Sequence, residues 1–266
     1  MWLFQIYDAK ECERIVLDAL KSGYRLIDTA AYQNEAAVGS ALKKYGLPRE
    51  EIFVTTKLWV QDASYEGAKK ALRTSLDKLG LDYVDLYLVH QPMGDYHGAY
   101  RAMEEMYREG LTRAIGTANF YPAVLADLCE TVNVIPAVNQ VELHPFFAQE
   151  AALENMRYYK VQPQAWGSLA EGKLGIFVNQ TLTKIGAKYG KSAAQVALRW
   201  NIQRGVSVLT KAIREEHIKQ NIDIWDFVLT TEEMNIISKL DLGHSEIVDY
   251  SDPALVRTFH TWRLHI

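Results

Sequence analysis

Four side chains that can donate, accept or stabilise a proton occur in the first third of the chain. They are a carboxylate, a phenol, an ammonium group and an imidazole, at Asp28, Tyr32, Lys57 and His90. A free phenol has a pKa of about 10, and an adjacent ammonium group lowers that value because it stabilises the phenolate. These residue types predict a site that transfers protons.

Each of these residues also has a purely structural explanation when it is considered alone. Asp28 could cap a helix, Lys57 could extend its ammonium group to solvent, and His90 could be a hydrogen-bonded core residue. Capping does not explain an acid, a phenol, a lysine and a histidine on one face of a fold. The functional interpretation is therefore favoured when the four are considered together.

Three of the four residues end short apolar segments that are typical of β-strands. These segments are apolar on both faces, as parallel strands covered by helices should be. Asp28, Lys57 and His90 end the second, third and fourth segments. We expect eight strands, at Trp2–Gln5, Tyr24–Thr29, Ile52–Lys57, Val84–His90, Ala114–Thr117, Ala137–Val141, Val161–Trp166 and Val206–Leu209.

Segments with helical periodicity separate these strands. They are predicted at Glu11–Ser22, Glu35–Tyr45, Tyr65–Leu79, Ala99–Arg108, Tyr121–Glu130, Gln149–Tyr159 and Ser192–Arg204. The last has the clearest ends, because Ser192 and Gln195 have capping-box spacing and Gly205 follows as a stop signal. The count of eight strands, alternating with helices, favours a closed (β/α)8 barrel. The competing open sheet would ordinarily hold a dinucleotide over G-x-G-x-x-G, a motif that the sequence lacks.

In a barrel of this kind, catalytic side chains lie at the C-terminal ends of the strands. Polar or aromatic residues also end the later strands or follow them. They are Asn119, Asn139, Gln140, Trp166 and Lys211. We therefore expect these residues on the same rim as Asp28, Lys57 and His90.

Length and composition fit a single globular domain over residues 1–266. The chain is 48% hydrophobic and 23% charged with a formal net charge of −4, which excludes a disordered chain and offers no basic surface for nucleic acid. We expect no targeting segment, and the sequence contains no apolar run of about 18 residues that could span a membrane. The two cysteines fit a reducing cytoplasm. His260 and His265 lack metal-ligand spacing, so no metal site is predicted.

Six segments resemble the aldo-keto reductase family. They are GYRLIDTAAYQNEAAVG, FVTTKLWVQD, LDYVDLYLVHQP, RAIGTANFYP, IPAVNQVELHPFF and QAWGSLAEG. The resemblance runs from about Phe4 to the C-terminus, and it is greatest to bacterial members of the 2,5-diketo-D-gluconate reductase type. It implies a (β/α)8 barrel that binds NADPH in extended form across its C-terminal rim. We expect a cytoplasmic monomer that reduces aldehyde or ketone carbonyls.

The resemblance also implies that Asp28, Tyr32, Lys57 and His90 form a catalytic tetrad. Reduction of a carbonyl requires a hydride from the nicotinamide and a proton for the developing alkoxide. Tyr32 is the predicted general acid. Lys57, kept charged by Asp28, would lower the pKa of that phenol, and His90 would position the carbonyl oxygen.

Further positions are implied to hold the cofactor and the substrate. Trp166 would stack on the nicotinamide, and Asn119 and Gln140 would bind its carboxamide. Phe4, Trp59 and Trp166 would form apolar walls of the substrate pocket, with His90 also contacting the substrate.

The segment after the eighth strand is implied to select the dinucleotide. Lys211 and Arg214 would face the 2′-phosphate, where His217 replaces a second arginine of related sequences. Because a histidine is mostly neutral at pH 7, we expect NADPH to be preferred and NADH to be accepted as well. Two further residues, Gln220 and Asn221, would bind the adenine.

Several departures from the family pattern leave a second interpretation open. Asp28 and Tyr32 are four positions apart where the family usually has five, and Ala118 and Ala212 stand where it usually has serine. We also expect the barrel to lack the N-terminal hairpin that usually covers its floor, and an uncovered apolar floor should lower stability. The principal prediction is an NADPH-dependent reductase. The alternative is a catalytically impaired NADPH-binding or structural barrel.

Overall fold

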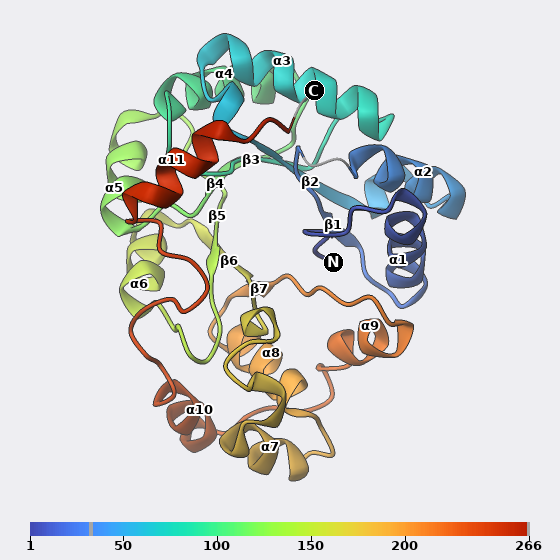
Figure 1. Ribbon diagram of the computed structural model, residues 1–266, viewed down its shortest axis with the longest axis vertical. Helices are drawn as coiled ribbons and strands as arrows, with labels where there is room; N and C mark the ends of the chain where they lie inside the picture. Colours follow the sequence, from blue (N-terminus) through green and yellow to red (C-terminus); the bar gives the residue numbers. More distant parts are fainter. Residues whose placement is uncertain (32–33, 265–266) are drawn as a thin grey trace.

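A computed structural model describes residues 1–31 and 34–264. Within these residues, seven parallel strands follow one another around a ring in sequence order, and helices surround them (Figure 1). The strands are β1 (Leu26–Asp28), β2 (Phe53–Leu58), β3 (Leu86–Val89), β4 (Ile115–Ala118), β5 (Val138–Glu142), β6 (Gln162–Trp166) and β7 (Ser207–Val208). This arrangement confirms the predicted parallel α/β barrel.

The eighth place in the ring is held by the first residues of the chain. Trp2 N donates to Thr210 O at 2.8 Å, just beyond β7, and Leu3 N donates to Asp28 O at 3.2 Å. The predicted strand over Trp2–Gln5 is nevertheless wrong, because Trp2 forms an isolated bridge and Gln5 has a φ of 61°. A left-handed residue ends an extended segment. The ring therefore closes through hydrogen bonds rather than through a regular eighth strand.

The seven predicted helices are present. They are α1 (Ala9–Lys21), α2 (Glu35–Tyr45), α3 (Tyr65–Leu79), α4 (Tyr96–Arg108), α5 (Pro122–Thr131), α6 (Glu150–Tyr159) and α8 (Ala193–Gln203). The Ser192 hydroxyl accepts from Gln195 N, and the Gln195 side chain accepts from Ser192 N, which confirms the capping box. Helices that were not predicted are α7 (Gln180–Ala187), α9 (Glu215–Ile222), α10 (Thr231–Ser238) and α11 (Pro253–Thr261).

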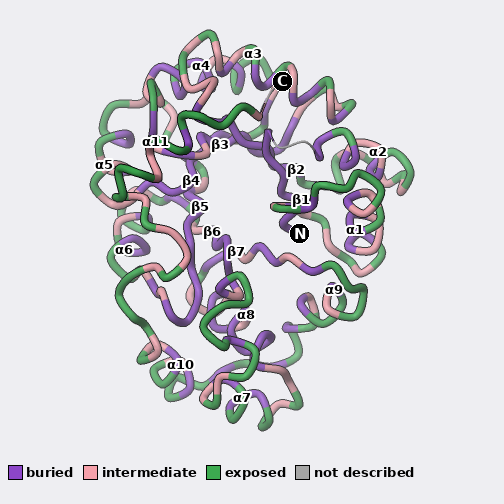
Figure 2. The backbone as a smooth tube through the Cα atoms, viewed as in Figure 1, coloured by how far each residue is buried: buried purple, intermediate pink, exposed green. Residues whose placement is uncertain are grey.

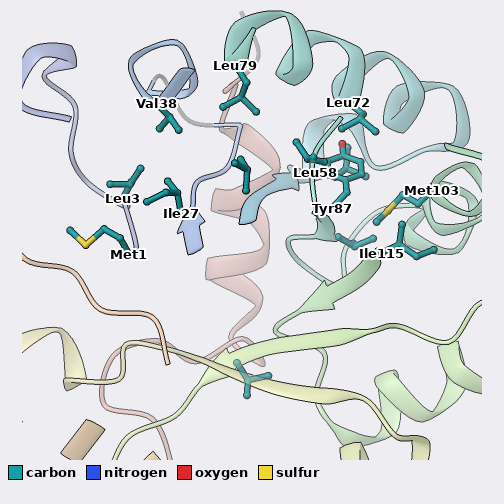
Figure 3. Close-up of a cluster of buried hydrophobic side chains, with 14 of the residues drawn as sticks. Met1, Leu3, Ile27, Val38, Leu58, Leu72, Leu79, Tyr87, Met103 and Ile115 are labelled. Atoms are coloured by element: carbon teal, nitrogen blue, oxygen red, sulfur yellow. The ribbon is translucent and has the colours of Figure 1, made fainter. Parts of the chain in front are cut away.

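Apolar side chains fill the layer between the strands and the helices. Ile27 and Leu58 from the strands pack in one cluster with Val38 and Leu72 from the helices, and all four are buried (Figure 3). Figure 2 shows the buried strands inside a ring of helices whose outer turns are exposed. This core fixes the strands, and with them the side chains at the strand ends.

Gly116 on β4 permits a close approach to β5. A Cβ at this position would lie 2.4 Å from Val138 O, which is backbone that cannot give way. A larger residue would separate the strands that carry Asn119 and Gln140.

Candidate active site

A buried ion pair lies at the C-terminal ends of β1 and β2. Lys57 Nζ donates to Asp28 Oδ1 and, at 2.9 Å, to Thr29 O. The exposed fractions of the Lys57 and Asp28 side chains are 1% and 0%. Burial lowers the pKa of Lys57 from its ordinary value, and attraction to Asp28 opposes that change. The structure thus brings the side chains of Asp28 and Lys57 into direct contact.

Gln140 reaches the same carboxylate from β5. Its Nε2 donates to Asp28 Oδ2 at 2.9 Å and to Gln164 Oε1 at 2.8 Å. All three side chains are buried. Both carboxylate oxygens of Asp28 are therefore held, one by an ammonium group and one by an amide. Gln164 was not identified from the sequence, where it reads as an ordinary strand residue.

His90 lies just beyond β3, beside Trp59. The two rings meet edge to face with their centres 5.1 Å apart. Burial, and next the charge of Lys57, hold the pKa of His90 well below its ordinary value of about 6.5. This imidazole is therefore neutral at pH 7, although part of the residue remains exposed to the adjoining cavity.

Asn119 links the ends of three strands. Its Nδ2 donates to His90 O at 3.0 Å, and its Oδ1 accepts from Trp166 Nε1 at 2.8 Å. A φ of 63° turns the Asn119 backbone out of β4, and asparagine tolerates that conformation better than most residues do. The indole of Trp166 is consequently fixed along one edge.

Tyr32, the predicted general acid, lies outside the described residues together with Gln33. The residues on either side are anchored beside the ion pair. Ala31 N donates to Lys57 O at 3.4 Å, and Thr29 Oγ1 donates to Asn34 Oδ1 at 2.8 Å. These anchors belong to the same rim as Asp28 and Lys57.

A cavity of about 230 Å³, which we call the catalytic cavity, adjoins these groups. Six residues predicted from the sequence line it: Phe4, Trp59, His90, Asn119, Gln140 and Trp166. These six residues contribute aromatic rings, one imidazole and two amides, and Gln5, Gln91, Glu171 and Lys173 add further polar groups to the lining. That combination suits a flat, mostly apolar ligand with a polar group at one end.

The C-terminal segment forms the remaining wall, and sequence reasoning missed it. Helix α11 crosses the ring near β3 and β4 (Figure 1). Its Phe259 and the following Trp262 pack on Trp59, with ring centres 5.2 and 5.5 Å away. The available signal was the spacing of Leu255, Phe259 and Trp262, which places apolar residues on one face of a helix.

A second cavity of about 560 Å³, which we call the rim cavity, lies beyond β7. Lys211, Arg214 and His217, the residues expected to face the 2′-phosphate, are among the residues that line it. Lys211 Nζ donates to Gln5 Oε1 at 3.0 Å, and Arg214 Nη2 lies 2.5 Å from His217 Nε2. Partial burial lowers the pKa of Lys211. The two cationic side chains and the imidazole outweigh the single carboxylate of Glu171 in the lining, which suits an anionic ligand such as a phosphate.

The two predicted adenine-binding residues lie outside the lining of both cavities. Gln220 is exposed on α9, whereas Asn221 is 7% exposed because it follows the fully buried Ile218 by three positions on the inward face of that helix. Because α9 was not predicted, the sequence did not show that these two residues point to different sides of a helix.

Comparison with known proteins decides the family. The model of the Aldo/keto reductase family matches residues 2–242. The chain belongs to this family. It is 43% identical over 241 residues to glyoxal reductase from Bacillus subtilis, covering 90% of this chain and 87% of that protein.

Solved structures agree with this assignment. An aldo-keto reductase from Bombyx mori in complex with NADP is 34% identical, with a TM-score of 0.87 over 93% of this chain and 88% of its own. A structure assigned as a 2,5-diketo-D-gluconic acid reductase B is 37% identical, with a TM-score of 0.90 over 94% and 90% of the two chains. The predicted family, barrel fold and resemblance to that reductase type are confirmed.

This aldo-keto reductase is an NADPH-dependent oxidoreductase that reduces aldehyde or ketone carbonyls. Of the two interpretations that the sequence left open, the comparisons support the reductase. Within residues 1–31 and 34–264, no group of three or more potential ligands is placed to hold a metal ion. In that same part of the chain, no helix has the length and apolar character needed to cross a membrane.

Proposed function

We propose that Asp28, Tyr32, Lys57 and His90 carry out the proton transfer of carbonyl reduction. The observation that supports this proposal is the buried pair of Lys57 and Asp28. A charged lysine in a nearly dry site stabilises a neighbouring phenolate strongly, because little water screens it. Capping or solvent exposure explains neither its burial nor its partner.

Each of the four residues has a distinct role in this proposal. The bound NADPH supplies the hydride. His90, which is neutral, holds the carbonyl oxygen by a hydrogen bond while Tyr32 delivers the proton to it. Lys57 stabilises the phenolate that remains, and Asp28 keeps Lys57 charged. Gln140 fixes the second oxygen of Asp28 and so fixes the orientation of the pair.

We propose that NADPH extends through both cavities. Lys211, Arg214 and His217 would bind its 2′-phosphate in the rim cavity, and Gln220 on the exposed side of α9 would contact the adenine while Asn221 supports that helix. The indole of Trp166 would stack on the nicotinamide. Because His217 adds no permanent charge, NADH would also bind.

The carboxamide of the nicotinamide would bind between Asn119 and Gln140. Both amides already have partners, since Asn119 contacts His90 and Trp166 while Gln140 contacts Asp28 and Gln164. Carboxamide binding therefore shares or replaces hydrogen bonds that hold the catalytic groups. This proposal couples occupancy of the cofactor site to the geometry of Asp28.

We propose small aldehydes and ketones as substrates of a cytoplasmic monomer in which residues 1–266 act as one barrel domain. The volume of the catalytic cavity and its walls at Phe4, Trp59 and Trp262 support this substrate size. A relative at 43% identity is a glyoxal reductase, so glyoxal belongs in the test panel.

NADPH oxidation with glyoxal, an aromatic aldehyde, a keto acid and a keto sugar tests the proposal. We expect turnover of at least one small aldehyde, and Trp166→Ala should weaken NADPH binding by about 1–3 kcal/mol by analogy with base–aromatic stacking. Trp225→Ala is the matched control, because Trp225 is 63% exposed and lines neither cavity. An unchanged dissociation constant for Trp166→Ala would remove Trp166 from the cofactor site.

A further inference from the structure

Trp2 stands where the two cavities meet. Among the described residues, Trp2, Gln5 and Glu171 line both the rim cavity and the catalytic cavity. Gln5 and Glu171 are polar residues whose side chains contact Lys211 and Lys173. Trp2 is a large aromatic residue with only 8% of its surface exposed. Its indole is therefore the bulky, packed group at the junction.

The indole of Trp2 packs against two other rings. Phe4 stacks on one side, with ring centres 5.2 Å apart and planes 21° from parallel. Trp166 lies 6.0 Å away with its plane tilted by 40°. Leu209 belongs to the same buried cluster. Trp2 consequently covers part of the Trp166 indole, on which the nicotinamide is proposed to stack.

The spacing between Trp2 and Trp166 is too small to admit another ring. Two layers of van der Waals contact at about 3.5 Å each require about 7 Å between near-parallel planes. The observed 6.0 Å and 40° leave no such space. A nicotinamide that stacks on this side of Trp166 must therefore displace the Trp2 indole.

The main chain of Trp2 is held in place, so the displacement must be a rotation of the side chain. Trp2 N donates to Thr210 O, and Trp2 bridges Asp28 in parallel register. These contacts close the barrel beside the ion pair. The backbone cannot carry the indole away without opening the ring of strands.

We propose that Trp2 is a gate residue for the dinucleotide, whose indole must rotate off Trp166 before NADPH can extend from the rim cavity into the catalytic cavity. This inference rests on the proposed placement of NADPH through both cavities. It implies that opening of the gate is a first-order step, which limits cofactor association when NADPH is abundant. Shortening the side chain removes that limit.

Stopped-flow binding tests the gate, with NADPH emission as the signal so that loss of a tryptophan does not confuse the measurement. The wild type should show an observed rate that levels off as the NADPH concentration rises. Trp2→Ala should show a rate that keeps rising linearly and exceeds the wild-type plateau at least severalfold. Trp2→Phe should give an intermediate plateau. Trp225→Phe and Trp225→Ala, on the surface, should match the wild type.

Each outcome bears on one claim. If the observed binding rate of the wild type rises linearly with NADPH concentration, the gate is overturned. This result needs no variant, so the test remains valid even if Trp2→Ala does not fold. Identical plateaus in the wild type and Trp2→Phe also overturn it, because the limiting step then lies elsewhere. Failure of the folded wild type to bind NADPH at all would overturn the proposed cofactor site itself, and the gate with it.

Discussion

Gln140 Nε2 donates a hydrogen bond to Asp28 Oδ2 at 2.9 Å, and these residues are 112 positions apart. The bond joins β5 to β1 across the interior of the barrel. It continues to Lys57 on one side and to Gln164 on the other. The ion pair of Asp28 and Lys57 is thus part of a buried polar network whose members come from four strands. Changes to one member should therefore alter both activity and stability.

Replacing Lys57 should lower both the activity and the stability of the protein. Lys57→Met leaves the Asp28 carboxylate buried without its ammonium partner, which typically lowers the free energy of unfolding by about 3–5 kcal/mol. Urea unfolding measures this loss. The double variant Asp28→Asn/Lys57→Met should recover much of the stability while remaining inactive, because no unpaired charge is left. A loss below about 1 kcal/mol for Lys57→Met would show that the pair is not desolvated as the structure indicates.

His90 should make the fold sensitive to acid. Because its pKa is lowered in the folded state, the unfolded chain binds a proton below about pH 6.5 that the folded chain resists. The contribution of neutral His90 to the free energy of unfolding is fully present above that pH. It falls as the pH drops, by at most about 1.4 kcal/mol per pH unit. Unfolding of the wild type and His90→Gln at about pH 7.5 and about pH 5 checks this. Equal pH dependence in both proteins would contradict it.

Ser245 should anchor the wall that the C-terminal segment contributes. Its hydroxyl donates to Glu142 Oε2 at 2.6 Å and accepts from the backbone N of Ile247 and Val248, each at 3.0 Å. Ser245→Ala leaves the buried Glu142 short of a donor, so we expect a loss of about 1–3 kcal/mol in stability. KM for the carbonyl substrate should rise severalfold with little change in kcat.

The exposed Ser251 in the same segment supplies the control for Ser245. Its hydroxyl bonds only the nearby exposed Asp249 among the hydrogen bonds described, so Ser251→Ala should leave KM unchanged. Steady-state kinetics of both variants make the comparison. If Ser245→Ala also leaves KM unchanged, the start of this segment does not shape the substrate site.

The predictable parts of this molecule are those determined by local pattern. Apolar runs ending in Asp28, Lys57 and His90 gave the strand ends, and capping at Ser192 gave the start of α8. The contacts that could not be predicted are tertiary. The sequence around Gln164 gives no sign of its hydrogen bond to Gln140. The apolar residues of α11 predict a buried helix face, but they do not predict that this face packs on Trp59. Gln5 was read as extended, although its left-handed backbone ends the first segment.

Cofactor choice should depend on His217. Its Nε2 contacts Arg214, and both residues line the rim cavity. An arginine at this position would supply a permanent charge and a charge-assisted contact to the 2′-phosphate, so His217→Arg should raise the ratio of kcat/KM for NADPH to that for NADH by about tenfold or more. Steady-state kinetics with both cofactors measure this ratio. An unchanged ratio in both His217→Arg and His217→Ala would exclude this role.

Tyr32→Phe is the sharpest test of Tyr32 as the proton donor, because it removes one hydroxyl and little else. Carbonyl reduction and NADPH affinity are measured side by side, with the surface variant Tyr158→Phe as the matched control, since Tyr158 is 77% exposed. Loss of a general acid should lower kcat by about 10²–10⁴-fold. The dissociation constant for NADPH should stay at its wild-type value, and Tyr158→Phe should behave as the wild type does. Equal carbonyl reduction by the wild type and Tyr32→Phe would contradict the assignment of Tyr32 as the proton donor.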